Sequence, residues 1–327
     1  MLLIVQFKKE LKDFVKKEIE PFCKSINELD ESKLIVESDF KELIINSFLL
    51  EKISILLAEF SNPAETKNVS FKNHLNKDES FKVKCSEKSI CIELGQIIKD
   101  NTGAQVLLDN PNKTFFVEKI NEKYYCYLII EGADNLVKRG YSTNNNEFIT
   151  ADYCKAMIDY SGYNDNGVLL DAFSHEGYVS IECALKLLKV GPAFFNSKNF
   201  DFEIPAPKVK PLKNKILCYS DSMADLKFAK QNAKLSKTFK FMDFGFTTLN
   251  DIDYTLKEEK IDYFVSVLPK NADIEKLFFQ LDYIMKKKCT IVILTSQDIA
   301  GKFEEFKFKI IDTIKCFENK NMIKLAR

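Results

Sequence analysis

The sequence predicts an α/β protein built from three successive units. Its 327 residues exceed the usual size of one hydrophobic core, so more than one domain is expected. Hydrophobic residues make up 46% of the chain, with only 10 glycines and 8 prolines, which excludes collagen-like and disordered classes. Along the whole chain, apolar runs of strand length alternate with amphipathic segments of helix length.

The first unit is predicted to cover residues 1–62 and to alternate strands with helices. Its apolar runs, typical of strands, lie at 2–7, 33–38 and 53–60. The amphipathic segments between them, at 8–22 and 41–52, predict helices. This order is typical of a small α+β domain.

The second unit is predicted to cover residues 63–145. A strand at 81–85 precedes a helix at 89–103, which is expected to end at Gly103. Two runs with period-two alternation, 113–120 and 123–130, then predict a hairpin whose turn is Asn121-Glu122. The Asn-rich and Ser-rich segment that follows is expected to be a linker.

The third unit, residues 146–327, predicts a parallel sheet covered by helices on both faces, because its strand runs are continuously apolar. Its predicted strands lie at 167–173, 215–220, 238–244, 261–268 and 290–295, followed by a closing antiparallel pair at 306–314 and 322–327. Its predicted helices lie at 151–162, 178–189, 223–236 and 273–288.

Composition narrows the function further. The 48 basic residues balance the 48 acidic ones, so no global positive field points to DNA or another polyanion. The nine cysteines are scattered without a C-x-x-C pair, which predicts reduced thiols in the cytoplasm and no metal site. The apolar opening at 2–7 is too short for a signal sequence or a membrane span, so a soluble protein is expected.

Three segments of the second unit, at 81–85, 92–111 and 136–142, resemble the THUMP-domain tRNA methyltransferases, which modify a guanine N2 amine. The last one, LVKRGYS, reproduces the family's Lys/Arg-Arg-Gly-Tyr exit pattern at Lys138, Arg139, Gly140 and Tyr141. The resemblance covers nearly the whole chain. It implies a ferredoxin-like domain at 1–62, a THUMP domain at 63–145 and a Rossmann-like class I methyltransferase domain at 146–327.

The family's first cofactor motif, D-P-x-C-G-S-G-T-x-x-I-E-A-A, is similar to the segment 171–184 here. Asp171, Gly177, Ile181 and Glu182 match, whereas His175 and Glu176 replace a glycine and a serine. The family's glycines let S-adenosylmethionine approach the backbone closely. A ring at 175 and a negative charge at 176 oppose that approach.

A second stretch, at 218–235, resembles the family segment whose first aspartate accepts hydrogen bonds from the cofactor ribose. Ser220 stands at that position, with Asp221 one residue out of register. A neutral hydroxyl is a poorer acceptor than a carboxylate. The resemblance places Asp243 where the family has an acidic residue near the adenine amine.

The family's catalytic motif, N-P-P-Y, corresponds to Val267, Leu268, Pro269 and Lys270. In the family an Asn or Asp oxygen and a proline carbonyl accept from the target amine, and the aromatic ring stacks on the flipped base. Valine accepts no hydrogen bond, and lysine does not stack as tyrosine does. Only Pro269 is kept, so no catalytic residue is assigned.

The resemblance also implies the partner. A THUMP domain would hold the acceptor stem and 3′ end of tRNA, which points to Lys138, Arg139 and Tyr141 as RNA contacts. Lys208 and Lys210 belong to a lysine-rich insertion at 191–214. The sequence of this insertion fits an RNA contact and an ordinary solvated surface equally well.

Three functional hypotheses follow. The preferred one is a tRNA-binding protein with a degenerate, non-catalytic methyltransferase domain, acting as an RNA-binding subunit or adaptor in tRNA modification. The alternative is an active S-adenosylmethionine-dependent tRNA guanine-N2 methyltransferase with divergent motifs. The third is a protein partner that activates another modifying enzyme and touches RNA only incidentally.

Overall fold

A computed structural model of the chain describes residues 1–141, 150–207, 211–256, 258 and 260–327. These residues form two compact units. The first unit consists of Met1–Leu136 with Lys198–Asp201, and the second of Val137–Ser197 with Phe202–Arg327. The segments at 1–62 and 63–136, predicted as parts of separate domains, thus lie in one unit.

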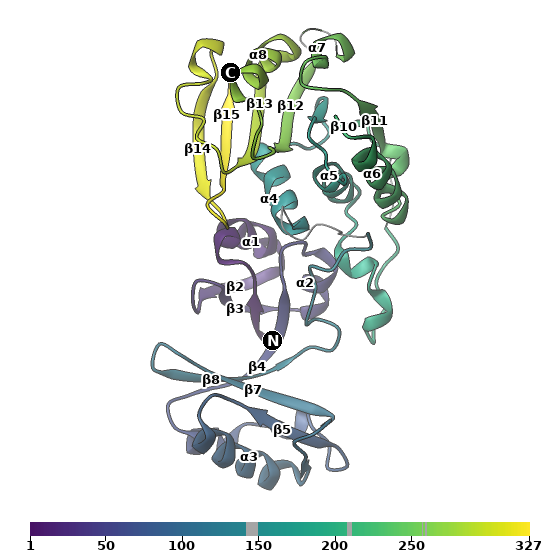
Figure 1. The fold of residues 1–327 in the computed structure, drawn as a ribbon. Helices are drawn as coiled ribbons and strands as arrows, with labels where there is room; N and C mark the ends of the chain where they lie inside the picture. The colour runs from purple at the N-terminus through teal and green to yellow at the C-terminus, as the bar shows by residue number, and fades with distance from the viewer. Residues whose placement is uncertain (142–149, 208–210, 257, 259) are drawn as a thin grey trace. The chain divides into compact units, whose positions relative to one another are not determined.

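The first unit is organised around one eight-stranded sheet (Figure 1). Its strands, in sheet order, are β2 (Cys23–Glu28), β3 (Lys33–Ser38), β1 (Leu2–Gln6), β4 (Lys52–Phe60), β8 (Lys123–Ile129), β7 (Lys113–Ile120), β5 (Ser80–Lys84) and β6 (Gln105–Val106). Its helices are α1 (Lys12–Ile19), α2 (Phe40–Asn46) and α3 (Lys88–Thr102). The antiparallel pairing of β4 with β8 joins the two predicted domains through backbone hydrogen bonds.

The first four strands confirm the predicted ferredoxin-like arrangement. The chain order is strand, helix, strand, strand, helix, strand, and all three pairings in the order β2-β3-β1-β4 are antiparallel. The sequence prediction omitted β2, because its residues CKSINE show no clear apolar alternation and none is fully buried.

The remaining elements of this unit match the predicted strands and helix closely. α3 ends at Gly103, which adopts a left-handed conformation with φ +75°. The β7–β8 turn uses Asn121 and Glu122, both with positive φ as a two-residue hairpin requires. A core beneath α3 includes Phe81, Leu94 and Phe115.

The second unit contains a seven-stranded sheet (Figure 1). In sheet order its strands are β11 (Met242–Phe246), β10 (Ile216–Ser220), β9 (Leu169–Asp171), β12 (Ile261–Val267), β13 (Met285–Thr295), β15 (Asn321–Ala326) and β14 (Lys309–Lys315). The first five are mutually parallel, and β15 lies antiparallel between β13 and β14. The closing pair is therefore antiparallel as predicted, but the last strand is internal and β14 forms the edge.

Helices cover both faces of this sheet, as predicted. They are α4 (Ala151–Ser161), α5 (Tyr178–Leu188), α6 (Met223–Leu235), α7 (Ile252–Thr255) and α8 (Ile274–Ile284). Leu170 of β9 faces the core that α7 and α8 cover. Its neighbour Asp171 points to the opposite face, where it contacts Ser180 of α5.

The predicted helix at 273–288 is too long. It ends at Ile284, and Lys286, Lys287 and Lys288 belong to β13. Lys286 pairs with Asp262 of β12 at 2.9 Å, so this lysine links two strands rather than ending a helix. Among the residues that the structure describes, the helices are all too short or too polar to span a bilayer.

Candidate cofactor and catalytic site

The candidate site lies at the carboxyl ends of β9, β10 and β12 in the second unit. β9 has β10 on one side and β12 on the other, so the chain order reverses between β9 and β12. Open parallel sheets bind ligands at such a reversal. The segments that follow these strands, at 172–177, 221–222 and 268–270, include many of the predicted site residues.

The loop at 172–177 has a sharply turned backbone. Ser174 N–H donates to the Tyr219 carbonyl at 3.0 Å, which ties the loop to β10. Gly177 adopts φ +86°, and a Cβ there would lie 3.0 Å from Ala229 Cβ on α6. Both the positive φ and the close approach of α6 therefore favour glycine at 177, whether or not a ligand binds.

His175 lies at a backbone position that favours glycine. It adopts φ +46°, a conformation that costs a residue with a Cβ on the order of 1–2 kcal/mol. Its Nε2 lies 3.2 Å from the carbonyl oxygen of Val267, at the end of β12. The imidazole thus connects the loop after β9 with the segment that corresponds to the catalytic motif.

Glu176 directs its carboxylate into the protein. The side chain is buried and accepts a hydrogen bond from the hydroxyl of Tyr178. The Glu176 carbonyl accepts from Asn232 Nδ2 at 3.2 Å, a second link between this loop and α6. The charge at 176 is therefore enclosed by protein groups.

Asp171 is a structural carboxylate. It is 0% exposed, and its two oxygens accept from Ser266 Oγ at 2.6 Å and from Ser180 Oγ at 3.2 Å. Burial raises the pKa of this carboxyl to about 7, although the hydrogen bonds from the two serines oppose the shift. These bonds join β9, β12 and α5, so Asp171 shapes the loop without reaching a ligand.

The residues that follow β10 give a weak site for ribose. Ser220 is buried, and its Oγ accepts the Ser222 N–H at 3.1 Å. Asp221 is exposed at the start of the turn into α6. A hydroxyl that is already engaged does not replace the carboxylate that holds two ribose hydroxyls in the family.

Asp243 requires a correction. The register pairs it with Leu217, near the beginning of β11, whereas Ser220 and Phe246 mark the carboxyl ends of these two strands. Three residues of strand place Asp243 about 10 Å from the edge of the site. It does not stand where an adenine amine would be bound, because the strand lies two residues later than the sequence prediction.

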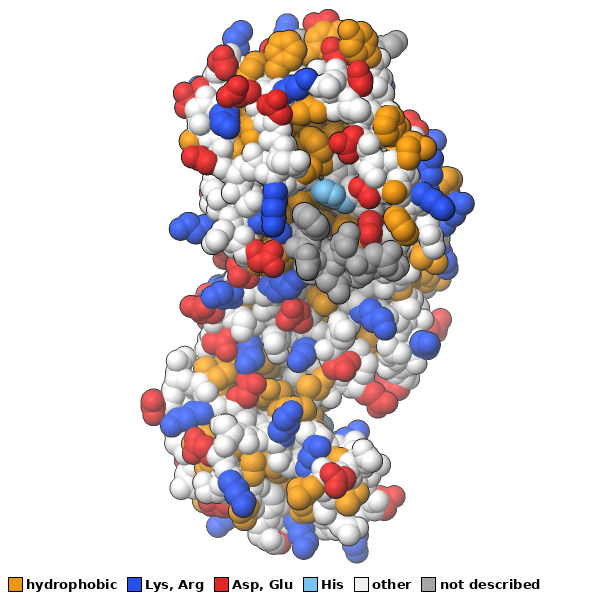
Figure 2. Space-filling view, viewed as in Figure 1, with side chains coloured by type: hydrophobic (Ala, Val, Ile, Leu, Met, Phe, Trp, Pro, Cys, Tyr) orange, Lys and Arg blue, Asp and Glu red, His pale blue; other side chains and the backbone are white. Residues whose placement is uncertain are grey.

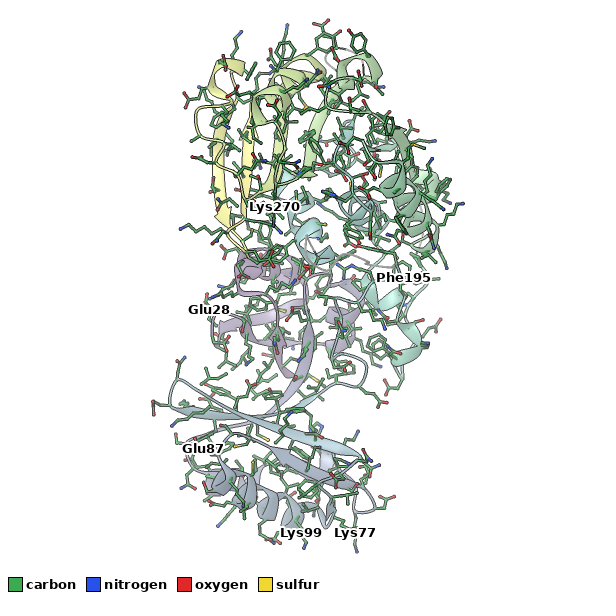
Figure 3. All side chains as sticks on the ribbon, viewed as in Figure 1. Glu28, Lys77, Glu87, Lys99, Phe195 and Lys270 are labelled. Atoms are coloured by element: carbon green, nitrogen blue, oxygen red, sulfur yellow. The ribbon has the colours of Figure 1, made fainter. Side chains whose placement is uncertain are left out.

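The segment that corresponds to the catalytic motif has its backbone groups engaged within the protein. Besides the Val267 carbonyl, which faces His175, the Pro269 carbonyl accepts from Gln297 Nε2 at 3.0 Å and from Ala272 N–H at 3.1 Å. Leu268 is buried and its N–H donates to the Leu294 carbonyl at 3.0 Å. Lys270 is exposed, and Figure 3 labels it in the loop after β12.

The exit motif is also corrected by the structure. The Arg139 side chain is only 2% exposed and forms a bidentate pair with Glu182 of α5, at 2.9 and 3.0 Å. Tyr141 is buried too and donates its hydroxyl to Glu182 at 2.9 Å. Burial, together with the Glu182 charge, raises the pKa of that phenol well above its usual value, so it remains a neutral donor. Neither residue presents its polar group to an RNA phosphate.

The other predicted RNA contacts have different outcomes. Lys138 is exposed, and its carbonyl accepts from Asn196 Nδ2 at 2.8 Å. Lys208 and Lys210 lie outside the described residues. Of the predicted contacts in the exit motif, Lys138 alone stays a prediction for RNA binding.

Sequence reasoning missed three residues that organise the site. Glu182 was noted as a motif match, but its buried pairing with Arg139 was not expected. Ser266 Oγ donates to Asp171 and accepts from the Phe173 N–H, and Gln297 donates a hydrogen bond to the Pro269 carbonyl. A polar residue inside an apolar strand run, such as Ser266 in YFVSVL, is the signal that could have identified the first bridge.

These residues do not fit S-adenosylmethionine well. Asp171 and Ser220 are buried and bonded internally, and Asp243 lies away from the edge. The loop backbone retains its turn, yet the acceptors that would hold the ribose and the adenine amine are not placed to do so.

Comparison with known proteins agrees with the predicted fold and family resemblance. No protein-family model matches the chain. The tRNA (guanine(6)-N2)-methyltransferase of Methanocaldococcus jannaschii is 25% identical over 221 residues, which span 59% of this chain and 58% of that protein. This match confirms the resemblance to tRNA guanine-N2 methyltransferases that the motifs predict.

Solved structures support the fold across the whole chain. TrmN from Thermus thermophilus has a TM-score of 0.72 with 12% identity and covers 100% of this chain and 99% of its own. A methyltransferase-type protein solved in complex with S-adenosylhomocysteine has a TM-score of 0.72 with 16% identity, covering 99% of this chain and 97% of its own. The second unit thus has the Rossmann-like class I methyltransferase fold.

Proposed function

We propose that this protein binds tRNA and does not transfer methyl groups, and that it acts as an RNA-binding subunit or adaptor in tRNA modification. The segment at 267–270 carries the proposal. A target amine needs free acceptor atoms at this segment, and here Val267 supplies no side-chain acceptor, while the Pro269 carbonyl already accepts two hydrogen bonds.

The residues around the candidate cofactor site support the same proposal. His175, Ser220 and Lys270 depart from the family pattern at three separate steps: approach to the backbone, ribose binding and base stacking. His175 and Ser220 are also engaged with other parts of the protein. One such change is compatible with altered specificity, whereas three together favour loss of the reaction.

The similarity to a tRNA methyltransferase supports tRNA as the RNA partner. The predicted THUMP region, which includes β5, α3 and the β7–β8 hairpin, would hold the acceptor stem and 3′ end by backbone contacts and shape. Lys138, Lys208 and Lys210 are the predicted RNA contacts that remain.

The alternative is an active S-adenosylmethionine-dependent tRNA guanine-N2 methyltransferase. The structural relative complexed with S-adenosylhomocysteine favours it, as does the turn at 172–177, whose backbone still has positive φ at His175 and Gly177. The two proposals differ in whether the side chains around that turn permit binding and transfer.

A methyl-transfer assay on unmodified tRNA separates the two proposals, with the Methanocaldococcus jannaschii relative as the positive control. The preferred proposal predicts no incorporation from labelled S-adenosylmethionine while the control is active. Incorporation that requires this protein would establish the alternative.

A gel-shift series tests the RNA-binding half of the proposal. Intact tRNA is expected to bind, the affinity is expected to fall with salt, and removal of the single-stranded 3′ end is expected to weaken binding. Equal affinity for intact and truncated tRNA would contradict the role assigned to the predicted THUMP region.

A further inference from the structure

The surface of α6 carries a concentration of positive charge that the proposed function does not use. Residues 223–240 contain five lysines and a single acidic residue, Asp225, in a chain whose net charge is zero. All five lysines are exposed: Lys227, Lys230, Lys234, Lys237 and Lys240. Among the described residues, none of these lysines belongs to an ion pair.

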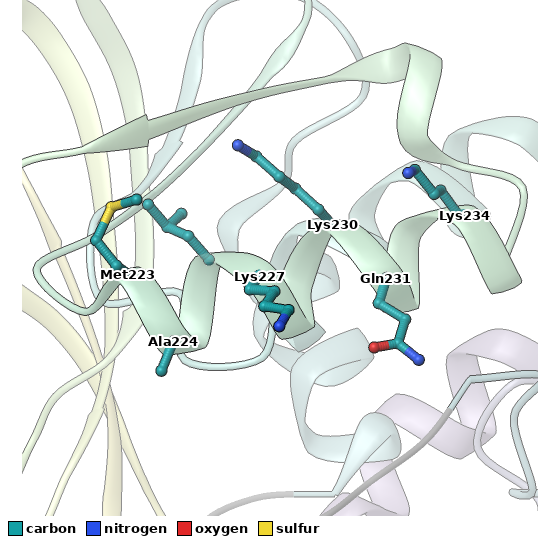
Figure 4. Close-up of a pocket in the computed structure, with 7 residues that line it drawn as sticks. Met223, Ala224, Lys227, Lys230, Gln231 and Lys234 are labelled. Carbon is teal, nitrogen blue, oxygen red and sulfur yellow. The ribbon is translucent and has the colours of Figure 1, made fainter.

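Three of these lysines line a shallow groove along the helix (Figure 4). The groove has a volume of about 750 Å³ and also includes Met223 and Gln231. In Figure 4, Lys230 and Lys234 project to the same side of α6, while the Lys227 side chain points in another direction. The three lysines are spaced three and four residues apart, so they are neighbours on the helix surface and span about 10 Å along it.

Aromatic rings lie next to these lysines. Lys230 Nζ is 5.9 Å from the centroid of Phe244, and Lys234 Nζ is 5.4 Å from that of Phe239. The two rings stack on each other at 5.3 Å, and Phe239 is 40% exposed. Phe246, at the end of β11, is 51% exposed. Exposed rings flanked by ammonium groups combine the two features that single-stranded nucleic acids require, stacking on bases and attraction to phosphates.

The face shown in Figure 2 has a mixed character. There, Lys and Arg side chains are interspersed with Asp and Glu side chains over both units. The cluster on α6 differs because its lysines are not paired with carboxylates and have phenylalanine rings beside them. Unneutralised lysines favour a polyanion as the occupant over a neutral apolar partner.

We infer that Lys227, Lys230 and Lys234, together with Phe239 and Phe244, form a second RNA-binding surface that takes a single-stranded RNA segment. The lysines contact phosphates, and the exposed Phe239 ring stacks on an unpaired base. This inference rests on the proposed tRNA-binding function and adds to it a binding surface in the methyltransferase-like unit.

Binding of fluorescently labelled single-stranded RNA and of intact tRNA, measured over a range of salt, tests the inference. The variant carries Lys227→Gln, Lys230→Gln and Lys234→Gln. Each lost phosphate contact makes the negative slope of log K against log salt shallower by about 0.7 for a single strand. Loss of three contacts is therefore expected to reduce the magnitude of the slope by about 2. Affinity for the single strand is expected to fall about tenfold or more at low salt.

A matched variant controls for the loss of charge. Lys287→Gln, Lys288→Gln and Lys309→Gln remove three exposed lysines of the same unit, on β13 and β14. This control is expected to bind RNA as the unchanged protein does. An equal loss of affinity in both triple variants would contradict a specific surface on α6.

Phe239→Leu separates stacking from charge. Loss of one stacked base is expected to weaken single-strand binding about fivefold or more with the salt slope unchanged. Unchanged affinity for RNA in both the α6 lysine variant and Phe239→Leu would overturn the inference. Binding of the α6 lysine variant to a polyglutamate peptide is measured as well, and a loss of peptide binding without any loss of RNA binding would also overturn it.

The outcomes also distinguish this inference from the proposed function. If intact tRNA binds and the α6 variant binds equally well, the α6 surface is wrong and the proposed function stands. If the unchanged protein binds no tRNA, both fail.

Discussion

At the scale of single residues, the buried contact between Arg139 and Glu182 changes the interpretation of the exit motif. The pair is bidentate and nearly inaccessible to solvent, and Tyr141 donates to the same carboxylate. Arginine suits this position because its planar guanidinium matches a carboxylate with two parallel hydrogen bonds. The motif therefore anchors the chain to α5. We expect replacement of Arg139 to lower the stability of the protein rather than to weaken a direct contact with RNA.

Arg139→Ala is expected to lower the free energy of unfolding by about 3–5 kcal/mol, because it leaves Glu182 buried without its partner. Chemical denaturation measures this loss. Arg139→Met combined with Glu182→Met is the matched control, since replacing both charges by apolar side chains is expected to recover most of the stability. A stable Arg139→Ala protein with weakened RNA binding would restore the original prediction of an RNA contact.

Asp171 gives a prediction about pH. Burial raises the pKa of its carboxyl to about 7, from an ordinary value of 3.8. Between about pH 4 and pH 7 the carboxyl is therefore protonated in the folded state but ionised in the unfolded chain. Because the folded state binds the extra proton, the free energy of unfolding falls as the pH rises through that interval.

Asp171→Asn is expected to remove this contribution, because asparagine does not titrate and retains an acceptor for Ser266. The difference in unfolding free energy between the variant and the unchanged protein should increase from pH 4 to pH 7 in favour of the variant, as measured by denaturation at each pH. A difference that is independent of pH would show that Asp171 is ionised throughout.

At the scale of elements, sequence patterns predicted most strands and helices but not all their boundaries. The continuous apolar runs of β10, β12 and β13 and the turn at Asn121-Glu122 are signals that one sequence carries by itself. β2 lacks such a run. In MKKKCTIVILT the strand begins before its apolar part, because Met285 already pairs with Ile261 of β12, and the lysines lie in the irregularity between that pair and the pair of Thr290 with Tyr263. The same limitation placed Asp243 incorrectly.

Packing between α5 and α6 gives a prediction at this scale. Gly177→Ala is expected to destabilise the protein by about 1–3 kcal/mol, because the new Cβ meets Ala229 at 3.0 Å and the residue keeps φ +86°. Gly162→Ala is the matched control, since Gly162 has φ +75° with nothing within 4 Å of a Cβ.

Thermal unfolding of both variants separates conformational strain from packing. Gly162→Ala should show the cost of the positive φ alone, about 1 kcal/mol, and Gly177→Ala should lose more. Equal losses would mean that α6 moves away from the loop at no cost, and that the glycine reflects conformation only.

At the scale of the whole molecule, the sequence predicted the fold class but not which site residues come together. The fold follows from the order of strands and helices and from the resemblance to a known family. Contacts such as Arg139 with Glu182 and His175 with Val267 join residues 43 and 92 positions apart, and no local pattern encodes them. They show that most groups near the candidate site bind other parts of the protein.

The zero net charge fits a protein that binds RNA through local surfaces. The surfaces proposed for this role are the lysines of α6 and the predicted contacts at Lys138, Lys208 and Lys210. Affinity for RNA is therefore expected to be modest and steeply dependent on salt. An adaptor of this kind is expected to act with a modifying enzyme, which affinity purification from the native source, with and without ribonuclease, would identify.

Calorimetric titration with S-adenosylmethionine is the decisive measurement of whether this site holds the cofactor. We expect no binding heat at ligand concentrations up to about 1 mM, so that any binding free energy is weaker than about −4 kcal/mol, whereas the Methanocaldococcus jannaschii relative is expected to bind under the same conditions. A dissociation constant in the micromolar range for this protein would contradict the claim that its site has lost the capacity to hold the cofactor.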